Sequence, residues 1–338
     1  MKPRPAPAVP PATSPRAASP SRQEAAGSVL SRLAGASAWL ARYLERAENT
    51  ARLAAAAQHL SLSIDPTDGE APWALALRVG LPAIDPATVG GPAAAAALLL
   101  VDRAQPSSVV GSLQWVRENA RAARHLLTSD LWEAINQAYI ESRGWDADGI
   151  SGRGLDDFLG WTRRQCQWIR GAALDVPQRS LRELLAWGQA VERIDCQARL
   201  LTASLPALDG IPEPAPGSGP HRRWQALLAA SASGEAYRRR AGGRLRADEA
   251  LALLVGDEES PRSLAGCAAR ALDSLCGFAG EAAGPAQAAA ARVAEVVAGI
   301  SPTTLPGDTS PLAELLAANN TAAEAVETFH FASGPAAA

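Results

Sequence analysis

The sequence predicts an all-α fold of two pseudo-symmetric helical modules, which derive from an internal duplication and pack as one elongated or bundle-like domain. Long segments repeat apolar residues at helical spacing, and strand patterns are scarce. Clusters of proline and glycine divide these segments into separate helices. Three short matches between the two halves occur in the same order, which is typical of a duplication.

The 338 residues of the chain are enough to bury a sizeable core. Residues 1–27 are rich in Pro, Ala, Ser and Arg and lack the apolar stretch of a signal peptide, so they are predicted to be a disordered extension. The predicted folded domain covers residues 28–338. Its first copy spans about 28–145, its second copy about 155–300 and a C-terminal helix about 310–330.

A long helix is predicted to begin at Ser28, a candidate N-cap, and to continue to Pro66. Pro106 is expected in the first turn of a helix that runs to about residue 127, because a first-turn proline loses no hydrogen bond. Asp130, followed three residues later by a glutamate, resembles a capping box at the start of the next helix. Further helices are predicted at residues 73–79, 93–101, 155–173, 178–205, 221–240, 247–255, 261–278, 283–298 and 311–329.

The charge balance argues against nucleic-acid and membrane partners. A formal net charge of −3 and a pI near 5.9 give no general attraction to polyanions. The longest apolar run, residues 93–101, is much shorter than the roughly 20 residues that a membrane span needs. No transmembrane helix is therefore expected.

The cysteines, histidines and lysine restrict the chemistry of the chain. The four cysteines are dispersed and the histidines lack ligand spacing, so no disulfide framework, metal site or cofactor is predicted. We therefore expect reduced thiols in a cytoplasmic protein. Lys2 is the only lysine, which excludes a P-loop or a lysine nucleophile from the folded part.

The duplication hypothesis depends mainly on one motif. Residues 44–53 match residues 191–200 at a Glu-Arg pair, a second acid, an Ala-Arg pair and a leucine. Residues 105–109 match residues 260–264 around a Pro and a Ser, and a Trp-containing match lies between these two pairs. Copies of this length predict two modules packed on each other and not a solenoid.

Acidic and basic residues alternate on the helices that carry the motif. Glu48 and Arg52 are four residues apart, and such pairs lie on one helix face. A buried Glu–Arg network has to be paired and hydrogen-bonded, which fits either a structural lock between modules or an anion-recognising site. The residues expected to form structural pairs are Arg46, Glu192, Arg193, Asp195 and Arg199. The candidate binding residues are Arg42, Asn49, Arg52, Arg117, Asn119, Arg121 and Arg124.

Three carboxylates are candidates for catalysis. If Glu45, Glu48 and Glu118 converged in a cleft, burial and like-charge proximity would raise one pKa and produce a general base. We favour the lock for Arg46 and Arg193. We favour the cleft for Glu48, Arg117 and Glu118, because their charge pattern is not fully retained in the second copy.

Several of these motifs resemble the bacterial alpha-E domain family. The likeness runs from residue 28 to the C-terminus and is carried by residues 31–53, 117–121, 131–136 and 188–199. The chain departs from the family pattern at Gly35, Ala36, Ala41, Gln105 and Gln189, which puts in doubt any polar site that used those positions.

The resemblance implies a biochemical context. Members of the family are typically encoded beside, or fused to, circularly permuted ATP-grasp ligases, often with a transglutaminase-like protease. We therefore expect a helper or binding module of an amidoligase system, which engages the ligase or its peptide substrate through Glu/Arg-lined helices. The alternative is an enzyme that acts on an amide or ester, with Glu45 or Glu118 as general base and Arg117 or Arg121 stabilising an oxyanion.

Overall fold

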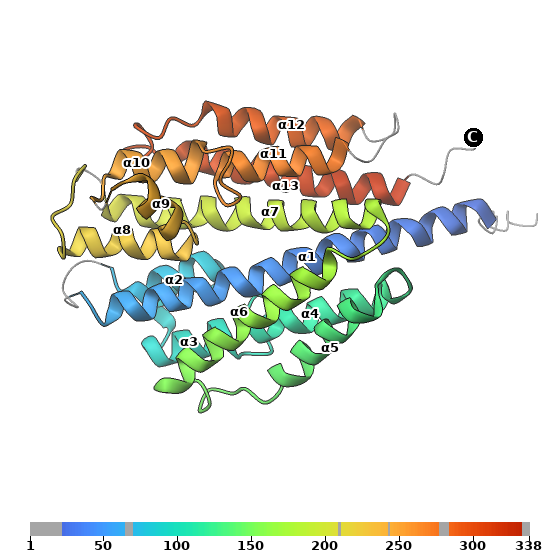
Figure 1. The fold of residues 1–338 in the computed structure, drawn as a ribbon, viewed down its shortest axis with the longest axis horizontal. Coiled ribbons are helices and arrows are strands. Elements are labelled where there is room, and N and C mark those ends of the chain that lie inside the picture. Colours follow the sequence, from blue (N-terminus) through green and yellow to red (C-terminus); the bar gives the residue numbers. More distant parts are fainter. Residues whose placement is uncertain (1–21, 65–69, 209–210, 243, 277–283, 333–338) are drawn as a thin grey trace, which may run out of the picture.

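The computed structural model describes the backbone of residues 22–64, 70–208, 211–242, 244–276 and 284–332. Side chains are described for the same residues from 35 to 327. This part of the chain contains helices, turns and loops but no strand, so the predicted all-α fold is confirmed for it (Figure 1).

Two long helices form the centre of the molecule. Helix α1 (Arg22–Ser61, 40 residues) and helix α7 (Arg179–Ser204, 26 residues) lie side by side and run in the same direction (Figure 1). A Cβ atom at Gly188 would lie 2.4 Å from the carbonyl oxygen of Ala38. The absence of a side chain at Gly188 therefore allows the two helix backbones to approach closely.

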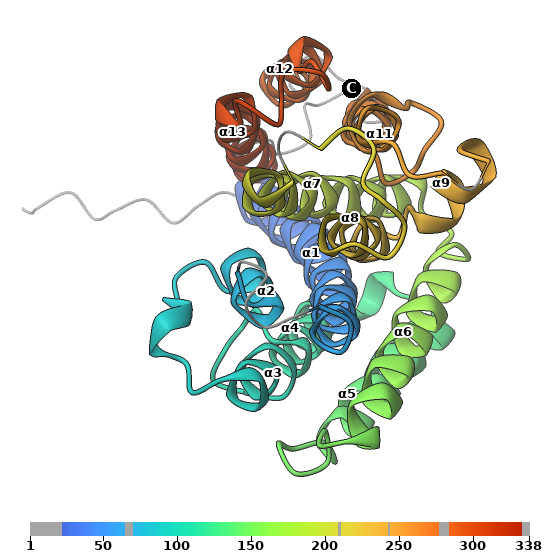
Figure 2. The same cartoon turned by 90° about the vertical axis from the view of Figure 1, so that its left-hand side faces the viewer.

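In the described part of the chain, seven helical segments lie between α1 and α7, and eight follow α7. Figure 2 shows α2 to α6 on one side of the central pair and α11 to α13 on the other. The first group consists of α2 (Pro72–Gly80), η1 (Pro86–Thr88), α3 (Pro92–Leu100), α4 (Val109–Ala122), η2 (Arg124–Leu126), α5 (Ser129–Ser142) and α6 (Arg153–Ala173). The second group consists of η3 (Leu205–Ala207), α8 (Gly219–Ala230), α9 (Gly234–Arg240), α10 (Ala247–Leu251), the π-helical turn η4 (Ala252–Gly256), α11 (Leu264–Cys276), α12 (Gly284–Gly299) and α13 (Ser310–Ala332).

Several predicted helix starts are wrong. Residues 22–27 belong to α1, so the predicted extension is too long and Ser28 is not the N-cap; residues 1–21 lie outside the described part. Helix α4 begins after Ser108, whose Oγ accepts a hydrogen bond from the backbone, and Pro106 lies in the preceding turn. Helix α5 is capped by Thr128 and not by Asp130. In α4 and α5 the hydroxyl side chain satisfies a free first-turn N–H group, which decides the start.

The helix predicted at 221–240 is two helices. Helices α8 and α9 are separated at Ala232, whose φ is 54°. This left-handed conformation is rare for a residue with a side chain. The periodic pattern continues across the break, so it could not indicate the turn.

Two turns in different halves have the same hydrogen-bond pattern. Ser108 Oγ accepts from the N–H of Gly111 at 2.9 Å, and Ser263 Oγ accepts from the N–H of Gly266 at 2.9 Å. A Cβ at either glycine would lie 2.1 Å from a carbonyl oxygen of its own turn. Residues 107 and 262, which precede the two serines, therefore occupy equivalent positions.

Candidate functional site

Glu45 lies at the interface of α1 and α7 and is only 1% exposed. Its carboxylate accepts hydrogen bonds from Arg193 Nε at 2.9 Å, Gln189 Nε2 at 2.9 Å and Arg170 Nη2 at 3.0 Å. Arg262 Nη1 lies 3.2 Å from its Oε1 atom. The departure from the family pattern at Gln189 thus retains a polar contact with this carboxylate.

Glu48 lies one helical turn further along α1 and is also 1% exposed. Arg52 donates to it from Nε at 3.0 Å and from Nη2 at 2.6 Å, and Arg262 donates from Nη2 at 3.2 Å. Arg170 bonds both Glu48 and Glu45. The two glutamates and their arginines therefore form one buried network, and the expectation that Glu48 lines a solvated cleft is wrong.

Glu192 on α7 has the reciprocal arrangement. It is 3% exposed and accepts from Arg46 Nε at 2.5 Å, Arg46 Nη2 at 2.9 Å and Arg42 Nε at 3.2 Å. The arginine after Glu45 thus bonds Glu192, while the arginine after Glu192 bonds Glu45. Asp195 accepts two hydrogen bonds from Arg199 at 2.7 and 3.0 Å, as Glu48 does from Arg52.

The network holds its carboxylates in the charged form. Burial alone would raise the pKa of Glu45, but the positive charges of Arg193, Arg262 and Arg170 lower it to about 2. The pKa of Glu48 is also lowered, because Arg170 and other arginines outweigh burial and the charge of Glu45. A carboxylate with a depressed pKa and no solvent access is a poor general base at neutral pH. The geometry therefore argues against catalysis by Glu45 and Glu48.

Two arginines of this network were not among the sequence-based candidates. Arg170 comes from α6, and Arg262 comes from the turn before α11. Arg262 lies in the segment 260–264 that matches residues 105–109, between the shared proline and serine. Its positive charge in this repeated segment could have marked it as a candidate partner of the glutamates. Arg170 had no such signal, because only the crossing of α6 over α1 brings it to Glu45.

Glu118 and its arginines form a separate group on α4. Glu118 is 33% exposed at its side chain and pairs with Arg117 at 3.3 Å and with Arg121 at 3.1 Å. Arg117 also bonds Asn136 and lies 4.6 Å from the centre of the Tyr139 ring. The ion pairs of Glu118 are thus with its own helix and not with the Glu45 network, so the three candidate carboxylates do not converge.

The remaining α4 candidates make local contacts. Asn119 Nδ2 donates to the carbonyl oxygen of Trp115 at 2.8 Å. The guanidinium of Arg124 lies 5.2 Å from the centre of the Trp132 ring on α5, an interaction that fixes the long side chain. The side chain of Arg121 is 67% exposed.

A wide basic groove lies beside α1. Its volume is about 1070 Å³, and its walls come from α1, α6, α8, α9 and residues 241, 244 and 245. Helices α6, α8 and α9 lie on one side of α1 in Figure 2. Glu235 is the only acidic residue of the wall, and His59 and His221 also contribute. The arginines of the wall are Arg52, Arg163, Arg222, Arg238 and Arg244. This excess of positive charge predicts affinity for anionic groups.

Most of the groove arginines are not neutralised by the protein. Among the described residues, only Arg52 pairs with a carboxylate, that of Glu48 in the buried network. Arg163, Arg238 and Arg244 are exposed and form no ion pair with any described residue. No sequence motif indicated this groove, since its arginines come from five separate segments.

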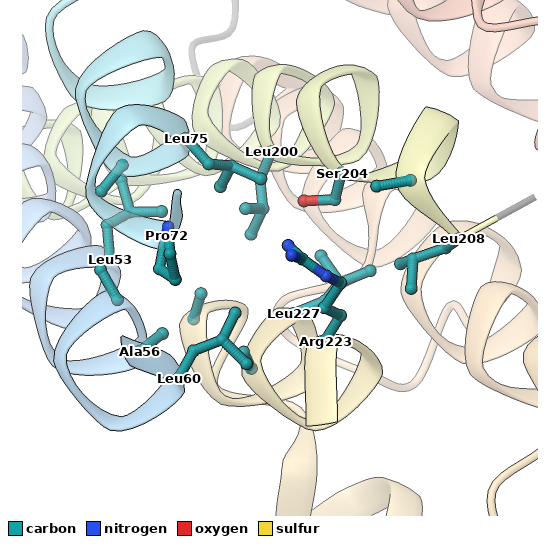
Figure 3. A pocket seen from close by; sticks show the side chains of 15 residues that line it. Leu53, Ala56, Leu60, Pro72, Leu75, Leu200, Ser204, Leu208, Arg223 and Leu227 are labelled. Atoms are coloured by element: carbon teal, nitrogen blue, oxygen red, sulfur yellow. The ribbon is translucent and has the colours of Figure 1, made fainter. Parts of the chain in front are cut away.

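A second cavity is apolar and small. Figure 3 shows Leu53 and Leu60 of α1, Leu200 of α7 and Leu227 of α8 around it, with Arg223 at one side. Its volume of about 40 Å³ is close to the roughly 30 Å³ that one water molecule occupies. It is therefore a packing defect between the central helices and not a site for an organic ligand.

The described residues contain no group of three or more His, Cys, Asp or Glu side chains that could hold a metal ion. No helix in the same part of the chain has the length and apolarity needed to cross a membrane.

The fold and the paired Glu-Arg motifs define the class of protein. A model of the Alpha-E family, described as a predicted alpha-helical domain with a conserved ER motif, matches residues 29–331. The chain belongs to the Alpha-E family. Its two Glu-Arg dipeptides, at residues 45–46 and 192–193, are those that bond each other across α1 and α7. Neither the curated proteins nor the solved structures compared with the chain match it.

Proposed function

We propose that this Alpha-E chain is a non-catalytic binding module of an ATP-grasp amidoligase system. The observation that carries the proposal is the basic groove, whose exposed arginines Arg163, Arg238 and Arg244 form no ion pair with any described residue. The buried Glu-Arg network is assigned to the stability of the fold, and the groove is assigned to the partner. The expected partners are a circularly permuted ATP-grasp ligase, a transglutaminase-like protease and the peptide substrate of the ligase.

The chemistry of the groove fits an acidic peptide or protein segment. Guanidinium groups bind carboxylates in a bidentate manner, and several of them along a groove favour an extended polyanionic chain. A volume of about 1070 Å³ exceeds that of an ordinary small-molecule pocket. Arg52 reaches both this groove and Glu48, so an occupant of the groove lies next to the buried network.

The test is binding to the expected ATP-grasp ligase. Arg163→Glu and Arg238→Glu reverse two exposed charges of the groove, and we expect each to weaken ligase or acidic-peptide binding about tenfold or more. Binding should also weaken as salt is raised, because the arginines are exposed.

The matched control is Arg270→Glu on α11, which reverses an exposed arginine outside the groove. It should leave binding unchanged. Failure of the unmodified chain to bind the ligase or an acidic peptide, or equal loss in the control, would contradict the proposal.

The alternative function is hydrolysis of an amide or ester by Glu118. One observation supports it: the carboxylate of Glu118 is partly exposed and pairs with two arginines. General-base catalysis contributes about 10²–10⁴-fold, so Glu118→Gln should reduce turnover by that factor with the fold intact. Equal turnover in the variant would remove Glu118 from any mechanism.

We infer that the two halves of the chain derive from an internal duplication. The reciprocal Glu-Arg pairs and the matching turns before α4 and α11 support this. Helix α6 packs on α1 and α5, as α13 packs on α7 and α12. This packing supports a division between the copies after α6, near residue 175, in place of the copies of about 28–145 and 155–300 expected from the sequence.

We also propose that the protein acts in the cytoplasm. Support comes from the four cysteines, all of which are free thiols. An ATP-dependent ligase partner would share this compartment.

A further inference from the structure

The half of the network around Glu45 contains a guanidinium group that the half around Glu192 lacks. Arg262 lies between Glu45, Glu48 and Asn49, with Nη1 3.2 Å from Glu45 Oε1, Nη2 3.2 Å from Glu48 Oε1 and Nη1 3.3 Å from Asn49 Oδ1. The residue in the equivalent turn of the other half is Ser107, whose side chain carries no guanidinium group.

A pocket lies where the equivalent guanidinium group would be. Its volume is about 170 Å³, several times the roughly 30 Å³ of a water molecule, and Ser107 forms part of its wall. The neighbours of Arg262 are Glu45, Glu48, Asn49, Arg52 and Arg193. Their counterparts, Glu192, Asp195, Cys196, Arg199 and Arg46, all line the pocket.

The two glutamates differ in the number of arginines that their Oε1 atoms contact. Glu45 Oε1 interacts with both Arg193 and Arg262. Glu192 Oε1 accepts from Arg46 Nε and from no other described residue. A carboxylate oxygen has two lone pairs, so Oε1 of Glu192, a residue of the pocket wall, retains an acceptor site.

We propose that this pocket binds a guanidinium group, in the manner in which Arg262 occupies the other half. The charges permit it, because Glu45 and Glu48 accept Arg262 in addition to Arg52, Arg170 and Arg193. Glu192 and Asp195 have the same number of arginines before a ligand binds, namely Arg42, Arg46 and Arg199.

A second polar group on the wall favours an arginine residue over a bare guanidinium ion. Asn49 is 6% exposed, and its Nδ2 atom has no hydrogen-bond partner among the described residues. It lines the same pocket. A carbonyl or carboxylate oxygen next to the guanidinium group would accept a hydrogen bond from Nδ2. The ligand class is therefore an arginine residue of a peptide or protein, or free arginine.

The pocket shares no wall residue with the basic groove, so this inference does not depend on the proposed function.

The test is titration of the whole chain with N-acetyl-L-arginine methylamide by calorimetry or NMR. The citrulline analogue serves as a neutral isostere, and agmatine serves as a guanidinium compound without carbonyl groups. We expect saturable binding of the arginine compound, weaker binding of agmatine and none of the citrulline compound.

Ser107→Arg supplies the side chain that the other half already has, and it should weaken binding about tenfold or more. Ser107→Ala is its control and should bind as the unmodified chain does. If Ser107→Arg does not fold, Asp195→Asn replaces it, with a severalfold loss expected. Absence of saturable binding, equal binding of citrulline, or unchanged binding in both Ser107→Arg and Asp195→Asn would overturn the proposal.

Discussion

Arg193 donates a hydrogen bond from Nε to Glu45 Oε1 at 2.9 Å and so joins the middle of α7 to the middle of α1. The reciprocal bond from Arg46 to Glu192 makes the contact two-sided. Each Glu-Arg dipeptide thus supplies an acid to one interaction and a base to the other. A buried charge that loses its partner costs several kcal/mol, so the two helices are held in one register.

The depressed pKa of Glu45 predicts how stability depends on pH. Its carboxyl has a pKa of about 2 in the folded chain against an ordinary value of 4.5. A lowered folded pKa gives stability that is complete above the unfolded value and is lost as pH falls toward the folded one. Glu45 alone should account for a loss of about 3 kcal/mol in the free energy of unfolding between pH 5 and pH 2.

Urea denaturation at a series of pH values measures this loss. Glu45→Gln should have a shallower dependence below pH 5, whereas Glu118→Gln should retain the slope of the unmodified chain. A free energy of unfolding that is flat from pH 5 to pH 2 would show that Glu45 is not held ionised by its arginines.

The close approach of α1 and α7 predicts different effects of alanine at two glycines. In Gly188→Ala the new Cβ would lie 2.4 Å from the carbonyl oxygen of Ala38, so the helices must separate. We expect a loss of about 1–3 kcal/mol in the free energy of unfolding. Gly171→Ala on α6 is the control, because a Cβ atom added there would meet no neighbouring atom within 4 Å. This change should raise the free energy of unfolding by up to about 1 kcal/mol. Equal effects of the two changes would contradict the described packing.

The four cysteines should differ in reactivity. Cys276 is exposed, whereas Cys166 and Cys267 are buried. Burial raises the pKa of Cys267 to about 12 and raises the pKa values of Cys166 and Cys196 as well, which keeps these thiols protonated at neutral pH. A thiol reagent such as Ellman's should modify one cysteine in the native chain and four after denaturation. Rapid modification of all four in the native chain would contradict the burial of Cys166 and Cys267.

The helical fold followed from the sequence because apolar periodicity extends over most of the chain. The starts of α4 and α5 did not, since Ser108 and Thr128 compete with nearby Pro106 and Asp130 for the same role. The break at Ala232 depends on a positive φ that no residue type at that position signals. Local capping chemistry therefore decided the boundaries that periodicity left open.

The network was only partly predictable for a different reason. The repeat of Glu45-Arg46 in Glu192-Arg193 indicated that these residues act together, and their pairing follows from the side-by-side packing of α1 and α7. The contribution of Arg170 depends on tertiary packing, and so does the separation of Glu118 from Glu45. The sequence pattern places residues on helix faces, but only the packing shows which faces meet.

The central claim is that the paired Glu-Arg motifs lock the two halves of the fold together. Denaturant unfolding of Glu45→Ala and Glu192→Ala tests it most directly, with Glu118→Ala as a control from the partly exposed α4 group. We expect each of the first two changes to lower the free energy of unfolding by about 3–5 kcal/mol, because each leaves buried arginines without their carboxylate. The control should stay within about 1 kcal/mol of the unmodified chain. A value within about 1 kcal/mol for both Glu45→Ala and Glu192→Ala would contradict the lock.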